Sequence, residues 1–267
     1  MSGIKRWRRQ RAGRYTVLML GLAAIGMVYA AVTGAGSAAS AATPGGPSPA
    51  DIAQGKAIFA ETCSSCHGMN AQGTSAGPGL IGVGAAAVDF QMSTGRMPGK
   101  DLDAEMPRKP VVFTTEQIHQ VAAYVSSLSG GPAIPSAAEV NPAGADVALG
   151  QQLFITNCAQ CHNFAGAGGA LTYGKYAPPL THSTPTQIYE AMLTGPEAMP
   201  VFSDTTITPA QKRDIIAYVT AVRAEPNPGG FSLGRVGPVT EGLVAFLGGI
   251  AILVFAAMWL TMRRREV

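Results

Sequence analysis

Two long apolar stretches lie near the ends of the chain. Residues 17–34 are uncharged and almost wholly apolar and follow a basic segment, residues 1–16, as a signal peptide or a retained transmembrane helix would. Residues 242–262 include twenty consecutive uncharged positions, which as a helix would span about 30 Å, the thickness of a bilayer core. An arginine-rich tail, residues 263–267, follows directly. Because basic flanks stay in the cytoplasm, we expect a cell-membrane protein with both termini inside and residues 51–241 outside.

The region between these stretches has the hydrophobic spacing of helices, and it repeats. Apolar residues recur every three or four positions in residues 115–128 and again in residues 208–222. Each of these segments contains an Ala-Tyr-Val triplet, and the two triplets are 94 residues apart. Upstream, a pattern of Gly, Phe and Cys at four-residue spacing starts at Gly55 and recurs 95 residues later, at Gly150. The sequence therefore predicts a mainly α fold with two tandem domains.

Composition sets the expected boundaries of these domains. Segments rich in Pro, Gly and Ala are unsuited to packed elements and are expected to act as linkers. The predicted order is a tether at 35–50, the first domain at 51–130, a linker at 131–145, the second domain at 146–226 and a linker at 227–241. The acidic residues Asp51 and Asp146 are expected to cap the first helix of each domain. Units of this size bury little apolar surface alone, so a bound cofactor would complete each core.

Composition and charge narrow the classes of function. Hydrophobic residues make up 47% of the chain and charged residues only 13%, which argues against a disordered chain. The net charge of +3 conceals a segregation, because residues 51–241 contain fifteen acidic and ten basic residues, a net of −5. The part expected outside the cytoplasm is therefore mildly acidic, and no nucleic-acid partner is predicted.

The four cysteines fall in two copies of the motif C-x-x-C-H, which is the attachment signature of c-type haem. The motif residues are Cys63, Cys66 and His67 in the first domain, and Cys158, Cys161 and His162 in the second. Each pair of thiols would form thioethers with the haem vinyl groups, and the adjacent histidine would be the proximal iron ligand. A thioredoxin-like redox pair or half a zinc site are the rival interpretations. A redox pair should follow a strand, however, and neither copy follows a β-rich run.

A methionine is expected as the second axial ligand of each haem. A shared M-x-T-G pattern followed by Met-Pro places Met97 and Met199 in equivalent loops, where each can approach the iron. The set of proposed iron ligands is therefore His67, Met97, His162 and Met199. Met106, which also precedes a proline, is the rival ligand for the first haem. The other methionines of the pattern, Met92 and Met192, are expected to pack in the core.

Two prolines and two further histidines complete the expected sites. The carbonyl groups of Pro78 and Pro178 are placed to accept a hydrogen bond from Nδ1 of the proximal histidines, with simple turn prolines as the alternative. His119 falls one position off the apolar stripe of its helix and should be exposed. His182 lies in a loop near the second haem, and a plain polar role is favoured over contact with a propionate or a partner.

The two domains resemble class I cytochromes c in their C-x-x-C-H helix, Pro–Leu loop, Met-Pro loop and closing helix. The order of the whole chain, with its C-terminal apolar helix and arginine-rich tail, resembles the dihaem cytochrome c subunit of the actinobacterial cytochrome bc1 (bcc) complex. The resemblance implies two covalently bound haem c groups and a complex with a cytochrome b subunit and a Rieske iron–sulfur subunit. It also implies direct electron delivery to an aa3-type cytochrome c oxidase.

The ligand set itself points to one class of mechanism. Iron with His and Met on its two faces has no open position, so it transfers electrons without binding a substrate. We therefore expect an electron relay without catalytic residues, and the resemblance implies that it acts as a subunit of a quinol–cytochrome c reductase. The alternatives are a subunit of another membrane dehydrogenase or oxidase and, from a different class, a dihaem peroxidase.

Overall fold

The structure is a computed structural model that describes residues 15–16, 18–27, 46–102, 105–225, 233–235 and 238–263. Residues 1–14 of the basic segment 1–16, most of the tether at 35–50 and the tail residues 264–267 lie outside the described residues. Contacts divide the chain into two units, residues 1–46 and 47–267. The second unit contains both of the predicted helical domains.

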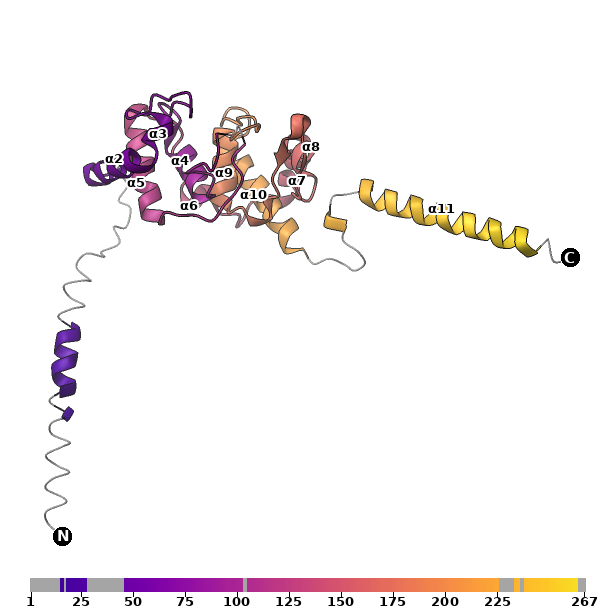
Figure 1. The fold of residues 1–267 in the computed structure, drawn as a ribbon, viewed down its shortest axis with the longest axis horizontal. Helices are drawn as coiled ribbons and strands as arrows, with labels where there is room; N and C mark the ends of the chain where they lie inside the picture. Colours follow the sequence, from indigo (N-terminus) through magenta and orange to yellow (C-terminus); the bar gives the residue numbers. More distant parts are fainter. Residues whose placement is uncertain are drawn as a thin grey trace, which may run out of the picture. The chain divides into compact units, whose positions relative to one another are not determined.

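In the described part of the first domain there are four helices, drawn in indigo to magenta in Figure 1. They are α2 (Pro49–Thr62), α3 (Ser64–His67), α4 (Gly84–Ser93) and α5 (Thr115–Ser129). Helices α2 and α5 cross closely at Gly55, where a Cβ atom would overlap the backbone carbonyl of Gln120. One turn later the rings of Phe59 and Tyr124 pack with their centroids 5.3 Å apart. The glycine at this crossing therefore lets the two helices approach and brings the aromatic pair into contact.

The second domain repeats this arrangement. Its helices are α7 (Val147–Asn157), α8 (Ala159–His162), α9 (Pro185–Thr194) and α10 (Pro209–Ala224). A Cβ atom on Gly150 would overlap the carbonyl of Asp214, and the rings of Phe154 and Tyr218 are again 5.3 Å apart. The predicted glycine–phenylalanine repeat is therefore the same helix crossing built twice.

A small hairpin distinguishes the second domain. It comprises β1 (Gly169–Ala170), the 3-10 turn η1 (Thr172–Gly174) and the antiparallel strand β2 (Tyr176–Ala177), and a second 3-10 turn, η2 (Leu180–His182), follows. The hairpin was not predicted from the sequence. It lies where the chain between His162 and Pro178 is five residues longer than that between His67 and Pro78. The extra residues are thus accommodated locally, without changing the helices.

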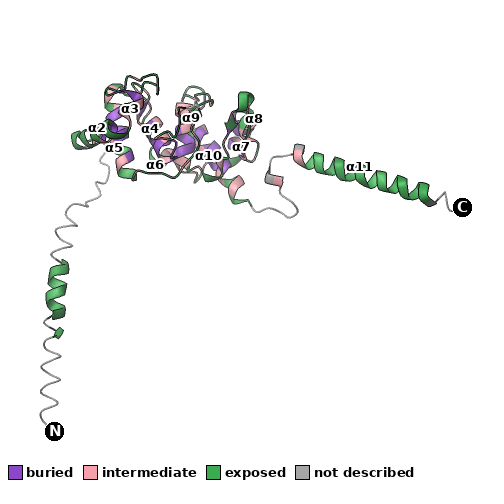
Figure 2. Cartoon of the chain, viewed as in Figure 1, coloured by how far each residue is buried: buried purple, intermediate pink, exposed green. Residues whose placement is uncertain are grey.

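Each domain has its own apolar core, shown in purple in Figure 2. The first core includes Phe59, Val88, Met92, Ile118, Val121 and Val125. The second includes Phe154, Ile188, Met192, Ile215, Ile216 and Val219. The apolar stripes predicted for the closing helices α5 and α10 supply much of both cores, and the predicted core positions of Met92 and Met192 are confirmed.

Side-chain caps fix where most of the helices begin. Thr114, Thr184 and Thr208 each form a capping box with a glutamine three residues later. Asp146 caps α7 by accepting from two backbone N–H groups, as predicted. The corresponding prediction for Asp51 was wrong, because Ser48 is the N-cap of α2 and accepts from the backbone N–H of Asp51. The Pro at position 49 suits the first turn, so the helix starts earlier than expected.

The linker at 131–145 is more ordered than its composition suggested. It contains a single helical turn, α6 (Ala137–Val140), which starts with a capping box between Ser136 and Glu139. Ile134 packs against the first core and Val140 against the second. The linker therefore contacts both domains that it joins.

The C-terminal apolar segment forms α11 (Pro238–Arg263), preceded by the short 3-10 turn η3 (Leu233–Arg235). Its residues Thr240–Met262 are long and apolar enough to cross a membrane, with a mean hydropathy of 2.5. The helix starts four residues before the predicted boundary at 242. Its apolar side chains are exposed (Figure 2), which for a helix of this length favours a lipid environment. In the N-terminal unit, Leu18–Met27 forms a shorter apolar helix within the predicted segment 17–34.

Candidate functional site

The two C-x-x-C-H motifs adopt the same local structure. Helix α2 ends at Cys63, whose backbone N–H still donates to Phe59, and the single turn of α3 then carries Cys66 and His67. The backbone N–H of His67 donates to the carbonyl of Cys63 over 3.0 Å, so one turn holds the motif together. Cys158, Cys161 and His162 repeat this arrangement at the end of α7 and in α8, with a bond of 2.9 Å.

All four cysteines lie in the described residues and none of them forms a disulfide, so their sulfur atoms are available for haem attachment. Burial raises the pKa of the Cys63 thiol, and it raises that of Cys158 to about 12. A redox-active cysteine pair needs a thiolate stabilised near neutral pH, so these environments disfavour the thioredoxin-like interpretation. Within the described residues, moreover, no three His, Cys, Asp or Glu side chains gather as a metal-ion site would require.

Each proximal histidine is oriented by a proline carbonyl. His67 Nδ1 lies 2.7 Å from the carbonyl oxygen of Pro78, and His162 Nδ1 lies 3.1 Å from that of Pro178. A carbonyl can only accept, so Nδ1 carries the proton and Nε2 keeps its lone pair for a metal. Burial lowers the pKa of His162, and the bond to Pro178 opposes that effect. The predicted role of the two prolines as hydrogen-bond acceptors is confirmed.

A cavity of about 940 Å³ lies beside the first motif. Cys63, Cys66, His67 and Met97 all line it, together with apolar side chains of α4 and α5. This volume is at the upper end of that of ordinary ligand pockets, and the thiols, imidazole and thioether are the donor set of a c-type haem. The residues present therefore fit a covalently bound haem.

Met106, the rival ligand, lines the same cavity as Met97. Met97 packs against the first core, and its backbone N–H donates to Gln91 over 3.0 Å. The backbone N–H of Met106 instead donates to the Glu197 carboxylate over 2.9 Å. The structure thus brings both methionines to the first site, and the choice of Met97 stays a prediction.

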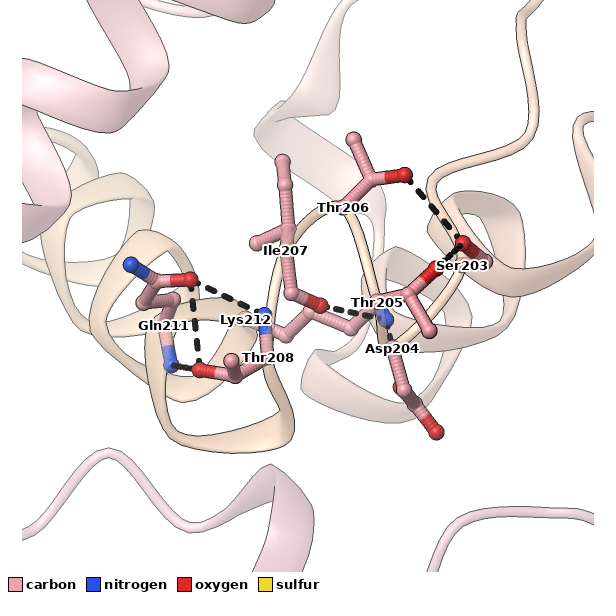
Figure 3. Close-up of polar contacts among 8 residues, drawn as sticks. All are labelled: Ser203, Asp204, Thr205, Thr206, Ile207, Thr208, Gln211 and Lys212. Carbon is pink, nitrogen blue, oxygen red and sulfur yellow. Dashed lines mark hydrogen bonds and ion pairs between the residues drawn. The ribbon is translucent and has the colours of Figure 1, made fainter.

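Met199 lies in a loop that several bonds fix to the second core. Its backbone N–H donates to Pro196, and that of Phe202 donates to the carbonyl of Met192. The end of the loop is held by Lys212, whose ammonium donates to Asp204 over 2.6 Å and to the carbonyl of Ile207 over 2.9 Å (Figure 3). The Lys212 side chain is fully buried.

Sequence reasoning missed Lys212 as a positioning residue. It is the fourth residue after the helix cap Thr208, as Ile118 is the fourth after the cap Thr114. Alignment of the two closing helices therefore places a lysine where the first domain has an apolar core residue. A lysine at an apolar core position was the sequence signal that could have identified Lys212.

The two domains touch through α4 and α9. Gln187 of α9 accepts from Arg108 over 3.0 Å, and its amide nitrogen donates to the side chain of Ser93 over 3.1 Å. Glu197 lies 3.6 Å from Arg96 Nε and also lines the first cavity. These contacts between domains were not predicted, because a repeat pattern describes each unit alone.

An acidic pair lies at the same interface. Glu190 of α9 is fully buried, and burial together with the nearby Asp89 raises the pKa of its carboxyl group to about 10. Both effects favour the protonated form of the Glu190 carboxyl group. His119 lies 3.6 Å from Asp89 with a side chain 54% exposed, which confirms the predicted exposure. His182 is exposed in η2, and its polar role stays a prediction.

Comparison with protein families agrees with the two-domain geometry. Residues 52–129 match the family model described as cytochrome c. Residues 145–219 match the model described as cytochrome C oxidase, cbb3-type, subunit III. The predicted fold class of two tandem cytochrome c domains is therefore confirmed, and domains of this type hold covalently bound haem c.

Curated relatives match nearly the whole chain. Two of these relatives are named cytochrome bc1 complex cytochrome c subunit. The protein of Corynebacterium efficiens is 42% identical over 284 residues, which cover 98% of this chain and 94% of the relative. That of Corynebacterium diphtheriae is 43% identical, over 98% of this chain and 100% of the relative. A protein of the same name from Mycobacterium leprae is 46% identical over 81% of this chain and 77% of its own.

The chain belongs to the family of cytochrome bc1 complex cytochrome c subunits. The resemblance inferred from the motifs and the C-terminal helix is confirmed. Members of this family are electron-transport proteins, and with α11 this one is a membrane-anchored cytochrome c subunit.

Proposed function

We propose that the chain is a dihaem electron relay within a quinol–cytochrome c reductase. The observation that carries the proposal is the duplicated site, in which each C-x-x-C-H histidine is oriented by a proline carbonyl and followed by a methionine loop. The domain boundaries proposed are those expected from composition, residues 51–130 and 146–226. Two complete sites support two haem groups rather than one.

The residues of each site have separate roles in this proposal. Cys63 and Cys66, and likewise Cys158 and Cys161, form the thioether links. His67 and Met97 hold one iron, and His162 and Met199 hold the other. A bound haem c supplies the redox-active iron. The chain would fix the histidine tautomer and exclude water with its apolar walls, and iron held by both a histidine and a methionine would leave no substrate site.

Contact between the domains supports a relay. The first cavity is lined by second-domain residues from Thr194 to Glu197, so the methionine loop of one site borders the other site. Electrons could then pass within one chain, without a carrier that diffuses between the two centres. The names of the relatives support membership of a cytochrome bc1 complex. Within such an assembly we propose a Rieske iron–sulfur subunit as donor, an aa3-type oxidase as acceptor and a cytochrome b subunit as neighbour.

The membrane arrangement proposed is that of two cytoplasmic ends and haem domains on the outer side. It rests on the arginine-rich flanks of both apolar segments and on α11. A subunit of a different dehydrogenase or oxidase would have the same anchor. A dihaem peroxidase would need one iron with an open position, and the methionines near the first site argue against it.

The number of haems can be tested on the purified complex. A denaturing gel stained for haem peroxidase activity, combined with the intact mass of the chain, should show two covalent haems. Replacing Cys63 and Cys66 by Ser should remove one haem, and replacing Cys158 and Cys161 should remove the other. An intact wild-type mass with a single haem increment would contradict the two-site proposal. Identification of the proteins that copurify tests the proposed partners.

A further inference from the structure

The two methionine loops differ in length, and the longer loop contains an acidic residue. In the first domain one residue, Arg96, separates Gly95 from Met97. In the second domain three residues separate Gly195 from Met199, and the middle one is Glu197. The longer loop thus presents an acidic residue that has no counterpart in the first domain.

Glu197 belongs to the second domain but lies at the first site. It lines the first cavity, and its Oε1 is 3.6 Å from Arg96 Nε and 2.9 Å from the backbone nitrogen of Met106. The side chains are largely buried, with 8% of Arg96 and 19% of Glu197 exposed. Charges shielded from water in this way interact more strongly than exposed pairs.

The backbone at Glu197 supports a specific placement. Its φ is +57°, in the left-handed region that a residue with a side chain adopts at a cost. The contacts to Arg96 and Met106 hold it there. Arg96 has a further contact, because its guanidinium lies 5.0 Å from the centre of the Phe90 ring. Glu197 is therefore held at the cavity wall, and Arg96 is held beside Glu197.

We propose that Glu197 of the second domain acts on the haem site of the first domain. Together with Arg96, its charge tunes the redox potential of the first haem. This inference rests on the proposed function, because it requires a haem held by His67. Arg96 directly precedes the proposed ligand Met97, and its Nε lies 3.6 Å from Glu197, which lines the cavity. The guanidinium therefore places a positive charge close to the first site, and Glu197 offsets that charge. Oxidation adds one positive charge to the iron centre, so a nearby positive charge raises the potential and a negative charge lowers it.

Neutralising one partner or the other should shift the redox potential of the first haem in opposite directions. Glu197→Gln leaves Arg96 uncompensated and should raise the potential of the first haem. Arg96→Gln leaves Glu197 uncompensated and should lower it. We expect each shift to be about three- to tenfold in the redox equilibrium constant, about 30–60 mV for a one-electron couple. The double variant should return close to the wild-type potential, and Glu197→Asp, which keeps the charge, should shift it less than Glu197→Gln.

The experiment is a potentiometric titration of both haems in the purified complex, followed by visible spectra. Glu116→Gln is the charge-matched control, because Glu116 is exposed in the first turn of α5 and should leave both potentials unchanged. Gln187, Ser93 and Arg108 still join the domains in Glu197→Gln, so that variant should keep the interface. The Met–iron absorption band reports whether the ligand loops remain intact.

Equal shifts in the same direction for the two single variants, or no shift in Glu197→Gln, would overturn the proposal. If Arg96→Gln does not fold, the sign of the shift in Glu197→Gln decides alone. Failure of the proposed function looks different, since the wild-type chain would then lack a covalent haem at Cys63 and Cys66 on the stained gel.

Discussion

The ammonium group of Lys212 lies 2.6 Å from a carboxylate oxygen of Asp204, although the lysine side chain is wholly buried and Asp204 is 57% exposed. The same ammonium donates to Ile207 and lies 5.6 Å from the centre of the Tyr189 ring. The first domain has Ile118 at the equivalent position. The second domain thus anchors the loop after Met199 with a charge, where the first uses apolar packing.

This anchor predicts that removing Asp204 destabilises the second domain more than replacing Lys212 does. Asp204→Ala leaves a buried ammonium with one carbonyl acceptor and should lower the free energy of unfolding by about 1–3 kcal/mol. Lys212→Met removes the charge while filling its space, and should change stability by less than about 1.5 kcal/mol. Urea denaturation of the complex followed by visible absorption measures both. The opposite order would show that the ion pair does not anchor the loop.

A second prediction concerns the helix crossing in the same domain. Gly150→Ala would push a Cβ atom into the backbone carbonyl of Asp214, so α7 and α10 must separate. We expect a loss of about 1–3 kcal/mol in the free energy of unfolding, because overpacking outweighs the better helix propensity of Ala. The control is Gln151→Ala on the exposed face of the same helix, which should be neutral within about 0.5 kcal/mol. A stabilising Gly150→Ala would mean that the crossing is loose.

The glycine repeat shows how far sequence reasoning extends. The spacing of Gly, Phe and Cys predicted two equal helical units, and the structure explains it by a close crossing at Gly55 and again at Gly150. The bonds from the proximal histidines to Pro78 and Pro178 were also predictable, because they lie within one repeat.

What could not be predicted lies where the repeats differ or touch. Ser48 caps the first helix instead of Asp51 because the preceding residues, outside the repeat, already favour a helix start. Glu197 and Gln187 form contacts between the domains, and a pattern within one chain segment does not indicate which surfaces meet. The hairpin of β1 and β2 arises from five extra residues that carry no hydrophobic periodicity.

A third prediction separates the two candidate ligands at the first site. Met97→His should lower the potential of the first haem and remove its Met–iron absorption band, because imidazole favours ferric iron more than a thioether does. Met106→Leu keeps the apolar volume and should change neither. Redox titration with visible spectra checks both variants. The reverse pattern would assign Met106 as the ligand.

The buried carboxyl group of Glu190 predicts a pH dependence of stability. Its pKa is raised from 4.5 to about 10 in the folded chain, so between these values the folded state holds a proton that the unfolded state has released. Stability should therefore fall as pH rises, by at most about 1.4 kcal/mol per pH unit. Glu190→Gln keeps an uncharged group of the same shape beside Asp89 and should flatten that fall.

Denaturation of the wild type and of Glu190→Gln at pH 6 to 9 measures this difference. Glu61→Gln, an exposed change at the end of α2, serves as the control and should follow the wild type. An equal pH dependence in wild type and Glu190→Gln would show that the carboxyl group is already ionised at neutral pH.

The last prediction concerns how electrons leave the chain. Residues 51–130 contain seven acidic and five basic residues, and residues 146–226 contain six and four, so each domain has a net charge of only −2. Long-range attraction of a diffusing basic carrier should therefore be weak. Helix α11 instead tethers the domains at the membrane, where a fixed neighbour is present at high effective concentration.

We expect quinol-driven oxygen uptake by the detergent-solubilised assembly without any soluble cytochrome c, and little change with salt. Uptake that appears only after soluble cytochrome c is added, and that falls steeply with salt, would instead identify the chain as a docking site for a mobile carrier. The matched control is the same assembly with Cys158→Ser and Cys161→Ser, in which the second haem is lost and uptake should stop because the relay is interrupted.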